Sequence, residues 1–122
     1  PSICTSEWIE SDLAKGKRYF VLEHDGDSCG CVALERAGPD ACYVERLAVL
    51  PAFRRRGYGE VLVRHVLDEA GRLGTRRVEI GIIAEHAELR AWYQRLGFVE
   101  KEMRRFAHLP FNVLFMYRDV PG

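Results

Sequence analysis

Residues 47–59 read Leu-Ala-Val-Leu-Pro-Ala-Phe-Arg-Arg-Arg-Gly-Tyr-Gly, and the rest of the chain is organised around them. The first three residues end a strand predicted over about 41–49, and Pro51 stops it because proline has no N–H for a β-ladder. The glycines then open a helix predicted over 57–73, where apolar residues recur with helical period up to Gly74. A helix start leaves backbone N–H groups without partners at the positive end of the helix dipole. The turn therefore predicts an anion-binding site.

Charge and size in this turn favour a pyrophosphate as the anion. Arg54, Arg55 and Arg56 can bond phosphate oxygens. Gly57 and Gly59 let the backbone approach a phosphate with no Cβ in the way. The dinucleotide pattern G-x-G-x-x-G and the Gly-Lys-Ser/Thr ending of a P-loop are both absent. An exposed helix start also suits such residues, so the turn by itself leaves a purely structural interpretation open.

Length and charge limit the class of protein. The 122 residues fit one domain, and 18 basic residues balance 18 acidic ones. No overall field therefore favours nucleic acid or an anionic membrane. No apolar run reaches the roughly 20 residues of a membrane-spanning helix, and the N-terminus lacks a signal-peptide pattern. We expect a single cytoplasmic domain with neither nucleic acid nor membrane as a partner.

The cysteines are predicted to be reduced thiols, because no export signal accompanies them. Cys29-x-Cys31 has the two-residue period of a strand rather than the gap of a zinc knuckle, and His24 is the one imidazole nearby. We expect small thiols packed beneath a sheet and no metal site. The four cysteines are Cys4, Cys29, Cys31 and Cys42.

The remaining periodicity predicts an α/β (α+β) sandwich with one mixed sheet. A short amphipathic helix is expected after Thr5, and the first clear strand begins at Arg18. Residues 41–83 form a strand-helix-strand unit of the kind that packs as a right-handed crossover, so the middle of the sheet should be parallel. Simple alternation puts Tyr43, Glu45, Leu47 and Val49 on one face. Further strands are predicted at 18–24, 28–36, 76–83, 98–106 and about 112–118, with a helix at 85–96.

The order of these motifs resembles the GNAT superfamily of N-acetyltransferases. Motif A of that family is a Leu-x-Val strand, a short loop, and Arg/Gln-x-x-Gly-x-Gly/Ala opening a helix, which stands here within residues 47–59. Motif B, a helix ending Tyr-x-x-x-Gly-Phe, stands here as residues 93–98. The resemblance spans roughly residues 18–118. It implies a mixed sheet, parallel and splayed at its centre, flanked by helices.

The resemblance also implies acetyl-CoA as the cofactor. The strand would splay open after Glu45, and its backbone beyond that point would pair with the pantetheine arm as an extra strand. The pyrophosphate would rest on the amides of residues 55–59, and the Leu47 amide is the candidate donor to the thioester carbonyl. The cofactor-binding residues implied in this way are Leu47, Ala48, Val49, Arg54, Arg55, Arg56, Gly57, Tyr58, Gly59 and His86.

The implied reaction is acetyl transfer to a primary amine by direct attack in a ternary complex. A lysine-like amine, with a pKa of about 10.4, must first lose a proton. Glu45 is the first candidate base, with an exposed strand carboxylate or a partner of Arg46 as the alternative, and Glu79 is the reserve. Tyr93 matches the family's general acid for the CoA thiolate, and it belongs equally to the buried stripe of its helix.

The sequence departs from the family pattern in three ways. His86 stands seven residues before Tyr93, where many members carry asparagine, and a surface histidine at a helix start is the alternative. The N-terminal strand and helix of the family are expected to be shortened or missing, as in a minimal version, a fragment, or the partner of another chain. The amine acceptor, a small molecule or a peptide, is not identified by any cluster, and a homodimer is compatible with the sequence.

Three other functions fit the same residues. A module that binds acyl-CoA without transfer would keep motif A. A nucleotide- or phosphate-binding protein unrelated to CoA could use the same helix start. A cysteine enzyme would use Cys29 or Cys42 with His24, although no flanking signature supports it.

Overall fold

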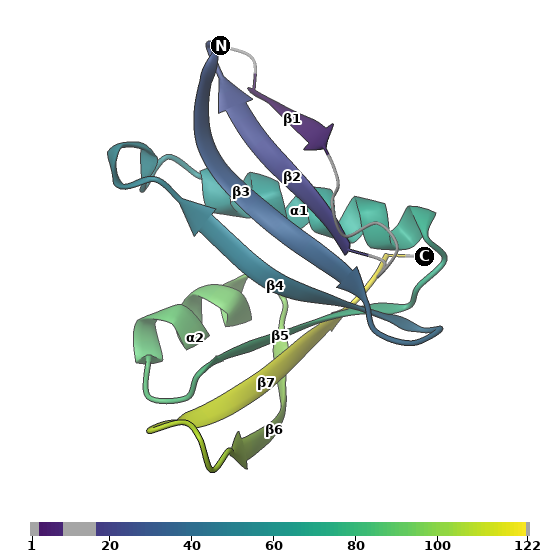
Figure 1. The fold of residues 1–122 in the computed structure, drawn as a ribbon, viewed down its shortest axis with the longest axis vertical. Coiled ribbons are helices and arrows are strands. Elements are labelled where there is room, and N and C mark those ends of the chain that lie inside the picture. The colour runs from purple at the N-terminus through teal and green to yellow at the C-terminus, as the bar shows by residue number, and fades with distance from the viewer. Residues whose placement is uncertain (1–2, 9–16, 122) are drawn as a thin grey trace.

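A single mixed sheet organises the protein in a computed structural model that describes residues 3–8 and 17–121. The sheet has seven strands in the order β1-β2-β3-β4-β5-β7-β6 (Figure 1). Neighbouring strands are antiparallel except β4 and β5, which are parallel, so the predicted mixed sheet with a parallel centre is confirmed. The elements are β1 (Ile3–Trp8), β2 (Lys17–His24), β3 (Asp27–Arg36), β4 (Ala41–Val49), the 3-10 turn η2 (Pro51–Phe53), α1 (Tyr58–Arg72), β5 (Arg77–Ile83), α2 (Ala87–Arg95), β6 (Val99–Arg105) and β7 (Asn112–Asp119).

The predicted N-terminal helix is wrong where the structure describes it. Residues 3–8 form β1, which pairs antiparallel with β2 from Ile3↔His24 to Trp8↔Tyr19. The rest of that prediction falls on residues 9–16, outside the described part of the chain. A short isolated helix is marginal in water, whereas the open edge of β2 offers a full ladder of backbone hydrogen bonds. Long-range pairing therefore overrides the local helical spacing.

The turn between β2 and β3 follows its sequence signature. Asp25 and Gly26 have φ values of 52° and 85°, so both central residues of the turn are left-handed. Such turns match the right-handed twist of paired strands and favour Asp-Gly. The hairpin predicted from Asp25-Gly26-Asp27 is confirmed.

A β-bulge at Glu45 changes the faces of β4. Pairing with β3 passes from Val44 directly to Arg46, so Glu45 is the extra residue. Leu47 and Val49 after the bulge consequently pack against the same core as Val44 before it. The prediction that alternate residues of this strand share one face is wrong, because it assumed an unbroken period of two.

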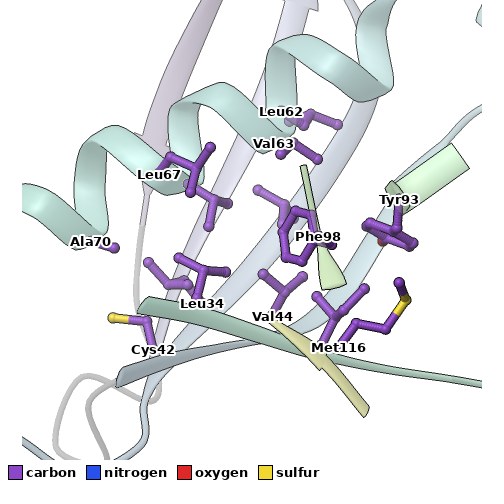
Figure 2. Close-up of a cluster of buried hydrophobic side chains, with 14 of the residues drawn as sticks. Leu34, Cys42, Val44, Leu62, Val63, Leu67, Ala70, Tyr93, Phe98 and Met116 are labelled. Carbon is purple, nitrogen blue, oxygen red and sulfur yellow. The ribbon is translucent and has the colours of Figure 1, made fainter. Parts of the chain in front are cut away.

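The core is one cluster between the sheet and both helices (Figure 2). Helix α1 contributes Leu62 and Val66, and α2 contributes Tyr93, which Figure 2 shows beside Phe98 and Met116. The largest fully buried side chains are Phe20, Leu22, Val32, Leu34, Leu62, Val66, Val78, Met116, Cys29 and Cys42. Burial of this apolar surface is the main term favouring the fold.

The described cysteines are free thiols, and they differ in burial. Cys29 and Cys42 are buried in the core beneath the sheet, as the sequence predicts, whereas Cys31 is exposed. Among the residues that the structure describes, no group of three or more potential metal ligands lies together. In the same residues, no helix is long and apolar enough to span a membrane.

A buried carboxylate joins β2 to α1. Glu69 is 2% exposed. It accepts hydrogen bonds from Arg18, with Nη1 2.6 Å from Oε2, and from Arg72 three residues along the helix.

Because the carboxylate would stay buried with one partner fewer, we expect Arg18→Met to lower the free energy of unfolding by about 2 kcal/mol. Arg72→Met should cost below about 1 kcal/mol, because that arginine is largely exposed. Urea denaturation of the two variants measures the difference, and equal losses would contradict it.

Candidate active site

Strands β4 and β5 pair only along their first halves. The parallel pairs run from Ala41↔Arg77 to Val44↔Ile80, and no later pair joins the two strands in the described part of the chain. Figure 1 shows the strands separating toward their C-terminal ends, with α2 beside the gap. The bulge at Glu45 falls where pairing stops, and bulges bend a strand and increase its twist. The predicted splay at the centre of the sheet is confirmed.

A cavity of about 520 Å³ occupies this splay and is called here the splay cavity. Residues 46–49 pair with β3 on one side, and on the other side they leave an unpaired strand edge toward the cavity. Unpaired N–H and C=O groups on such an edge can bond an extended ligand as an added strand. The residues lining the splay cavity are Cys31, Val44, Glu45, Leu47, Ala48, Ile80, Gly81, Ile82, Ile83, Leu89 and Tyr93.

A second cavity, of about 340 Å³, lies at the start of α1 and is called here the helix-mouth cavity. It shares Leu47 and Leu89 with the splay cavity, so the two adjoin along these side chains. It gathers most of the residues predicted to bind the cofactor. The lining residues are Leu47, Val49, Phe53, Arg54, Arg55, Gly57, Tyr58, Gly59, Glu60, Leu89 and Trp92.

The backbone of the turn is open toward the helix-mouth cavity. Gly57 is the N-cap of α1 with φ 81°, and no side chain caps the helix. A Cβ built on Gly57 would meet nothing within 4 Å. Arg55 also has a positive φ, 66°, which is uncommon outside glycine. Glu60, the acidic residue of the first turn, pairs with Arg64 at 2.7 Å, which offsets its charge. The uncapped N–H groups of α1 are therefore available to an anion, and the turn is called here the cradle.

The three arginines of the turn lie in different places. Arg54 donates from Nε to the Val49 carbonyl at 3.1 Å, which holds its side chain against the end of β4. Arg55 lines the helix-mouth cavity. The Arg56 guanidinium lies over the Phe53 ring, 5.5 Å from its centroid, and does not line that cavity in the described residues. Sequence alone treated the three as equivalent, and the structure separates them.

Tyr58 and Gly59 lie at the cradle for reasons of packing. The Tyr58 side chain is buried, with its ring 5.8 Å from that of His24, so its backbone is the part accessible to a ligand. A Cβ on Gly59 would lie 2.9 Å from Cζ2 of Trp92, so this glycine allows α1 to approach α2 closely. Trp92 and Leu89 line the cavity but were not predicted as site residues. Their only signal in the sequence is the apolar stripe of their helix, which predicts burial alone.

Tyr93 is both a core residue and a lining residue of the splay cavity. It is 6% exposed, and its ring packs edge-on against those of Trp92 and Phe98. Burial raises the pKa of Tyr93 to about 12. Within the described residues, its hydroxyl makes no hydrogen bond. The phenol is therefore neutral near pH 7 and can donate a proton or a hydrogen bond into the cavity.

The same burial makes stability depend on Tyr93 at high pH. Below about pH 10 the phenol is protonated in both the folded and the unfolded protein. Between pH 10 and its folded pKa of about 12, the unfolded state alone loses the proton, so the folded state is disfavoured. The free energy of unfolding should therefore fall as the pH rises through this window. We expect Tyr93→Phe to remove up to about 3 kcal/mol of that fall. Urea denaturation of both proteins across this window tests it, and parallel pH profiles would contradict it.

Glu45 and Glu79 differ in their surroundings. Glu45 is exposed at the splay cavity. Glu79 is held by Lys101, whose Nζ lies 3.1 Å from Oε2, and by Arg77 at 3.9 Å. Burial raises the pKa of Tyr43, and the negative charges of Glu45 and Glu79 raise it further, so both carboxylates act on this hydroxyl. Glu45 lines the splay cavity and Glu79 does not, so Glu45 is the better-placed candidate base.

His86 forms the N-cap of α2. Its Nδ1 accepts a hydrogen bond from the Leu89 amide at 3.2 Å, and the side chain is exposed. It does not line either cavity in the described part of the chain. Contact between His86 and a pantetheine arm stays a prediction, and it would have to use Nε2.

The splayed sheet and the uncapped helix beside it define the class: an α/β domain that offers one ligand a strand edge and an anion cradle. A model of the acetyltransferase (GNAT) family matches residues 2–98, and the chain belongs to this family. It is 31% identical over 102 residues to the [ribosomal protein bS18]-alanine N-acetyltransferase of Escherichia coli K12, covering 80% of this chain and 68% of the relative. It is 33% identical over 93 residues to the amino-acid acetyltransferase of Neisseria meningitidis serogroup A, covering 75% of this chain. The chain spans about 20% of that longer relative.

Solved structures have the same fold. A GNAT family acetyltransferase from Elizabethkingia anophelis, crystallised with acetyl-CoA bound, has a TM-score of 0.86 at 14% identity, covering 96% of this chain and 97% of that one. The ribosomal-protein-S18-alanine N-acetyltransferase from Escherichia coli has a TM-score of 0.81 at 19% identity, covering 99% and 96%. The GNAT-like fold predicted from motifs A and B is confirmed. The expected shortening of the N-terminal part stays a prediction.

Proposed function

We propose that this chain transfers an acetyl group from acetyl-CoA to a primary amine by direct attack in a ternary complex. The observation that carries the proposal is that the helix-mouth and splay cavities adjoin at Leu47 and Leu89, which line both. One end offers an anion cradle, and the other offers a strand edge with a neutral phenol. This order suits a ligand that carries a diphosphate at one end and a reactive thioester at the other.

The cradle residues would hold the diphosphate of acetyl-CoA. The amides at Gly57 to Gly59 supply N–H donors, and Arg54 and Arg55 supply positive charge. The backbone of residues 47–49 would bond the pantetheine arm, and the Leu47 amide is proposed as donor to the thioester oxygen. When bound, acetyl-CoA supplies the activated acetyl group.

Glu45 would accept a proton from the amine, and Tyr93 would donate one to the leaving sulfur. Glu45, directly or through a water, takes a proton from the ammonium so that the amine nitrogen can bond the acetyl carbon. As the carbon–sulfur bond breaks, the Tyr93 hydroxyl gives a proton or a hydrogen bond to the leaving sulfur. Burial keeps Tyr93 protonated. The same low-polarity surroundings would raise the pKa of the CoA thiol, so its thiolate would accept a proton more readily. The nitrogen would lose its second proton to solvent as the amide forms, Glu45 would release its proton, and the Tyr93 hydroxyl would be reprotonated from solvent.

The role of Glu45 is tested by Glu45→Gln. We expect kcat/KM for the amine to fall about 100-fold at pH 7, because general-base catalysis contributes about that much. The loss should shrink as pH approaches the amine pKa, where the free amine is already abundant. Glu79→Gln is the matched control and should lower kcat/KM less than about threefold. A larger loss in Glu79→Gln than in Glu45→Gln would reverse the assignment.

The function itself is tested by binding and turnover on the same preparation. We expect calorimetry to detect acetyl-CoA, with ATP failing to compete because it lacks a pantetheine arm. A CoA-release assay should then find turnover with an amine. The names of the two relatives suggest the first acceptors, a peptide with N-terminal alanine and free amino acids. Binding without turnover for any amine would favour an acyl-CoA-binding module, and no binding would end the proposal.

A further inference from the structure

A third cavity lies next to the splay cavity and is called here the β4 groove. Its volume is about 440 Å³. It shares Cys31 and Ala48 with the splay cavity, so the two adjoin along these side chains. The residues lining it are Val21, Ser28, Gly30, Cys31, Ala48, Val49, Leu50, Pro51 and Arg54.

The floor of the groove is a row of side chains on the face of the sheet away from α1. Val21 pairs with Cys31, and Cys31 pairs with Ala48, so the three lie in register across β2, β3 and β4. Residues paired in this way point to the same face. Their chain neighbours Leu22 and Val32 are 0% and 1% exposed and belong to the core beneath α1. The row therefore points the other way, and Cys31 and Ala48 are exposed there.

The chemistry of the groove is apolar along its length and charged only at its ends. Leu50 at the rim is 52% exposed and extends the apolar lining of the groove. Arg54 is the one charged residue that lines the groove in the described chain. Glu45 lies at the opposite end, in the splay cavity. A ligand with its ammonium at Glu45 and an uncharged tail toward Leu50 matches this distribution, whereas a second ammonium would meet Arg54.

We infer that the β4 groove binds the tail of the amine acceptor, and that the acceptor is a primary amine on an uncharged apolar chain. The inference rests on the proposed function, which puts the reacting amine in the splay cavity. The chain would run from there over Ala48 and Cys31 toward Leu50. Each methylene that leaves water along this path stabilises the complex.

A series of unbranched alkylamines from ethylamine to hexylamine tests the inference. These amines have nearly equal pKa values, so differences in kcat/KM report the tail rather than the nucleophile. With saturating acetyl-CoA, we expect kcat/KM to rise about fourfold per methylene until the groove is filled. Hexylamine should exceed 1,6-diaminohexane at least about tenfold, because the second ammonium of the diamine would lose water and meet Arg54. A flat series, or preference for the diamine, would overturn the inference.

Substitution of Cys31 locates the effect in the groove. Cys31→Asp puts a carboxylate on the floor at an exposed position, and it should reduce the gain per methylene to below about twofold. Cys31→Val keeps the floor apolar and should preserve the gain. Met103→Asp makes the same kind of change at an apolar residue of β6 that is 54% exposed, and it should also preserve the gain. An unchanged gain in Cys31→Asp would remove the assignment.

Calorimetry separates this inference from the proposed function. Ethylamine and hexylamine are titrated into the protein in the presence of CoA. If no amine is acetylated but hexylamine binds more tightly in the same proportion per methylene, the groove assignment holds and the proposed transfer fails. If polar amines are acetylated with no dependence on chain length, transfer holds and the groove assignment fails. If neither turnover nor chain-length-dependent binding is found, both are wrong.

Discussion

Gly57→Glu is expected to abolish acetyl-CoA binding, with the dissociation constant raised at least about 100-fold. Gly57 has φ 81° at the N-cap of α1, and the space beyond its missing Cβ is empty for 4 Å. A glutamate there would put its side chain into the mouth of the cradle and a negative charge where the diphosphate is proposed to lie. The substitution should also lower the free energy of unfolding by about 1–2 kcal/mol, because an L-residue is disfavoured in the left-handed region. Calorimetric titration of acetyl-CoA measures the loss.

Gly38→Glu is the matched control for this change. Gly38 has φ 91° and also has nothing within 4 Å of an added Cβ, and it lies in the turn between β3 and β4. The variant introduces the same strain and the same charge away from both cavities. We expect a similar change in thermal stability from the two substitutions and unaltered acetyl-CoA affinity in Gly38→Glu. Equal loss of binding in both would mean that strain or net charge, rather than the cradle, explains the effect.

Tyr93→Phe is expected to lower kcat about 100-fold while the dissociation constant of acetyl-CoA changes less than about twofold. The substitution keeps the ring that packs against Trp92 and Phe98 and removes only the hydroxyl. A hydroxyl that acts on the leaving sulfur matters in the transition state more than in the ground state, so turnover should fall without loss of affinity. Steady-state kinetics and calorimetry on the same preparation measure the two quantities.

The loss of turnover in Tyr93→Phe is expected to be independent of pH in the neutral range. With a pKa of about 12, Tyr93 stays protonated between about pH 6 and pH 9, so the ratio of wild-type to Tyr93→Phe turnover should be constant there. Tyr117→Phe serves as the control, because that ring lies under Arg77, 4.2 Å from its guanidinium carbon, outside both cavities. Wild-type turnover in Tyr93→Phe would remove the proton-donor assignment. A large loss of acetyl-CoA affinity would indicate a packing role instead.

The candidate site was partly readable from local sequence. Glycines directly after a strand and an arginine run predict an anion cradle, and Gly57 and Gly59 do lie at the start of α1. The tyrosine of motif B predicts a second participant, and Tyr93 lines the splay cavity. Such features depend on chain neighbours, because a left-handed turn and a helix N-terminus form within a few residues. The different positions of Arg54 and Arg56 were not readable, since each depends on a contact with another backbone or ring.

The sequence by itself determined the order of strands and helices along the chain from residue 17 onward, the glycine turn at the start of α1 and the family, because hydrophobic period and turn chemistry act over short stretches of chain. Only the tertiary structure decided that residues 3–8 form an edge strand, that a bulge at Glu45 reverses the faces of β4, and that three adjoining cavities share lining residues of this strand. These features arise when segments far apart in sequence pair and pack. A one-residue shift in such pairing turns every later side chain of the strand to the other face, and the neighbouring residues in the sequence do not predict that shift.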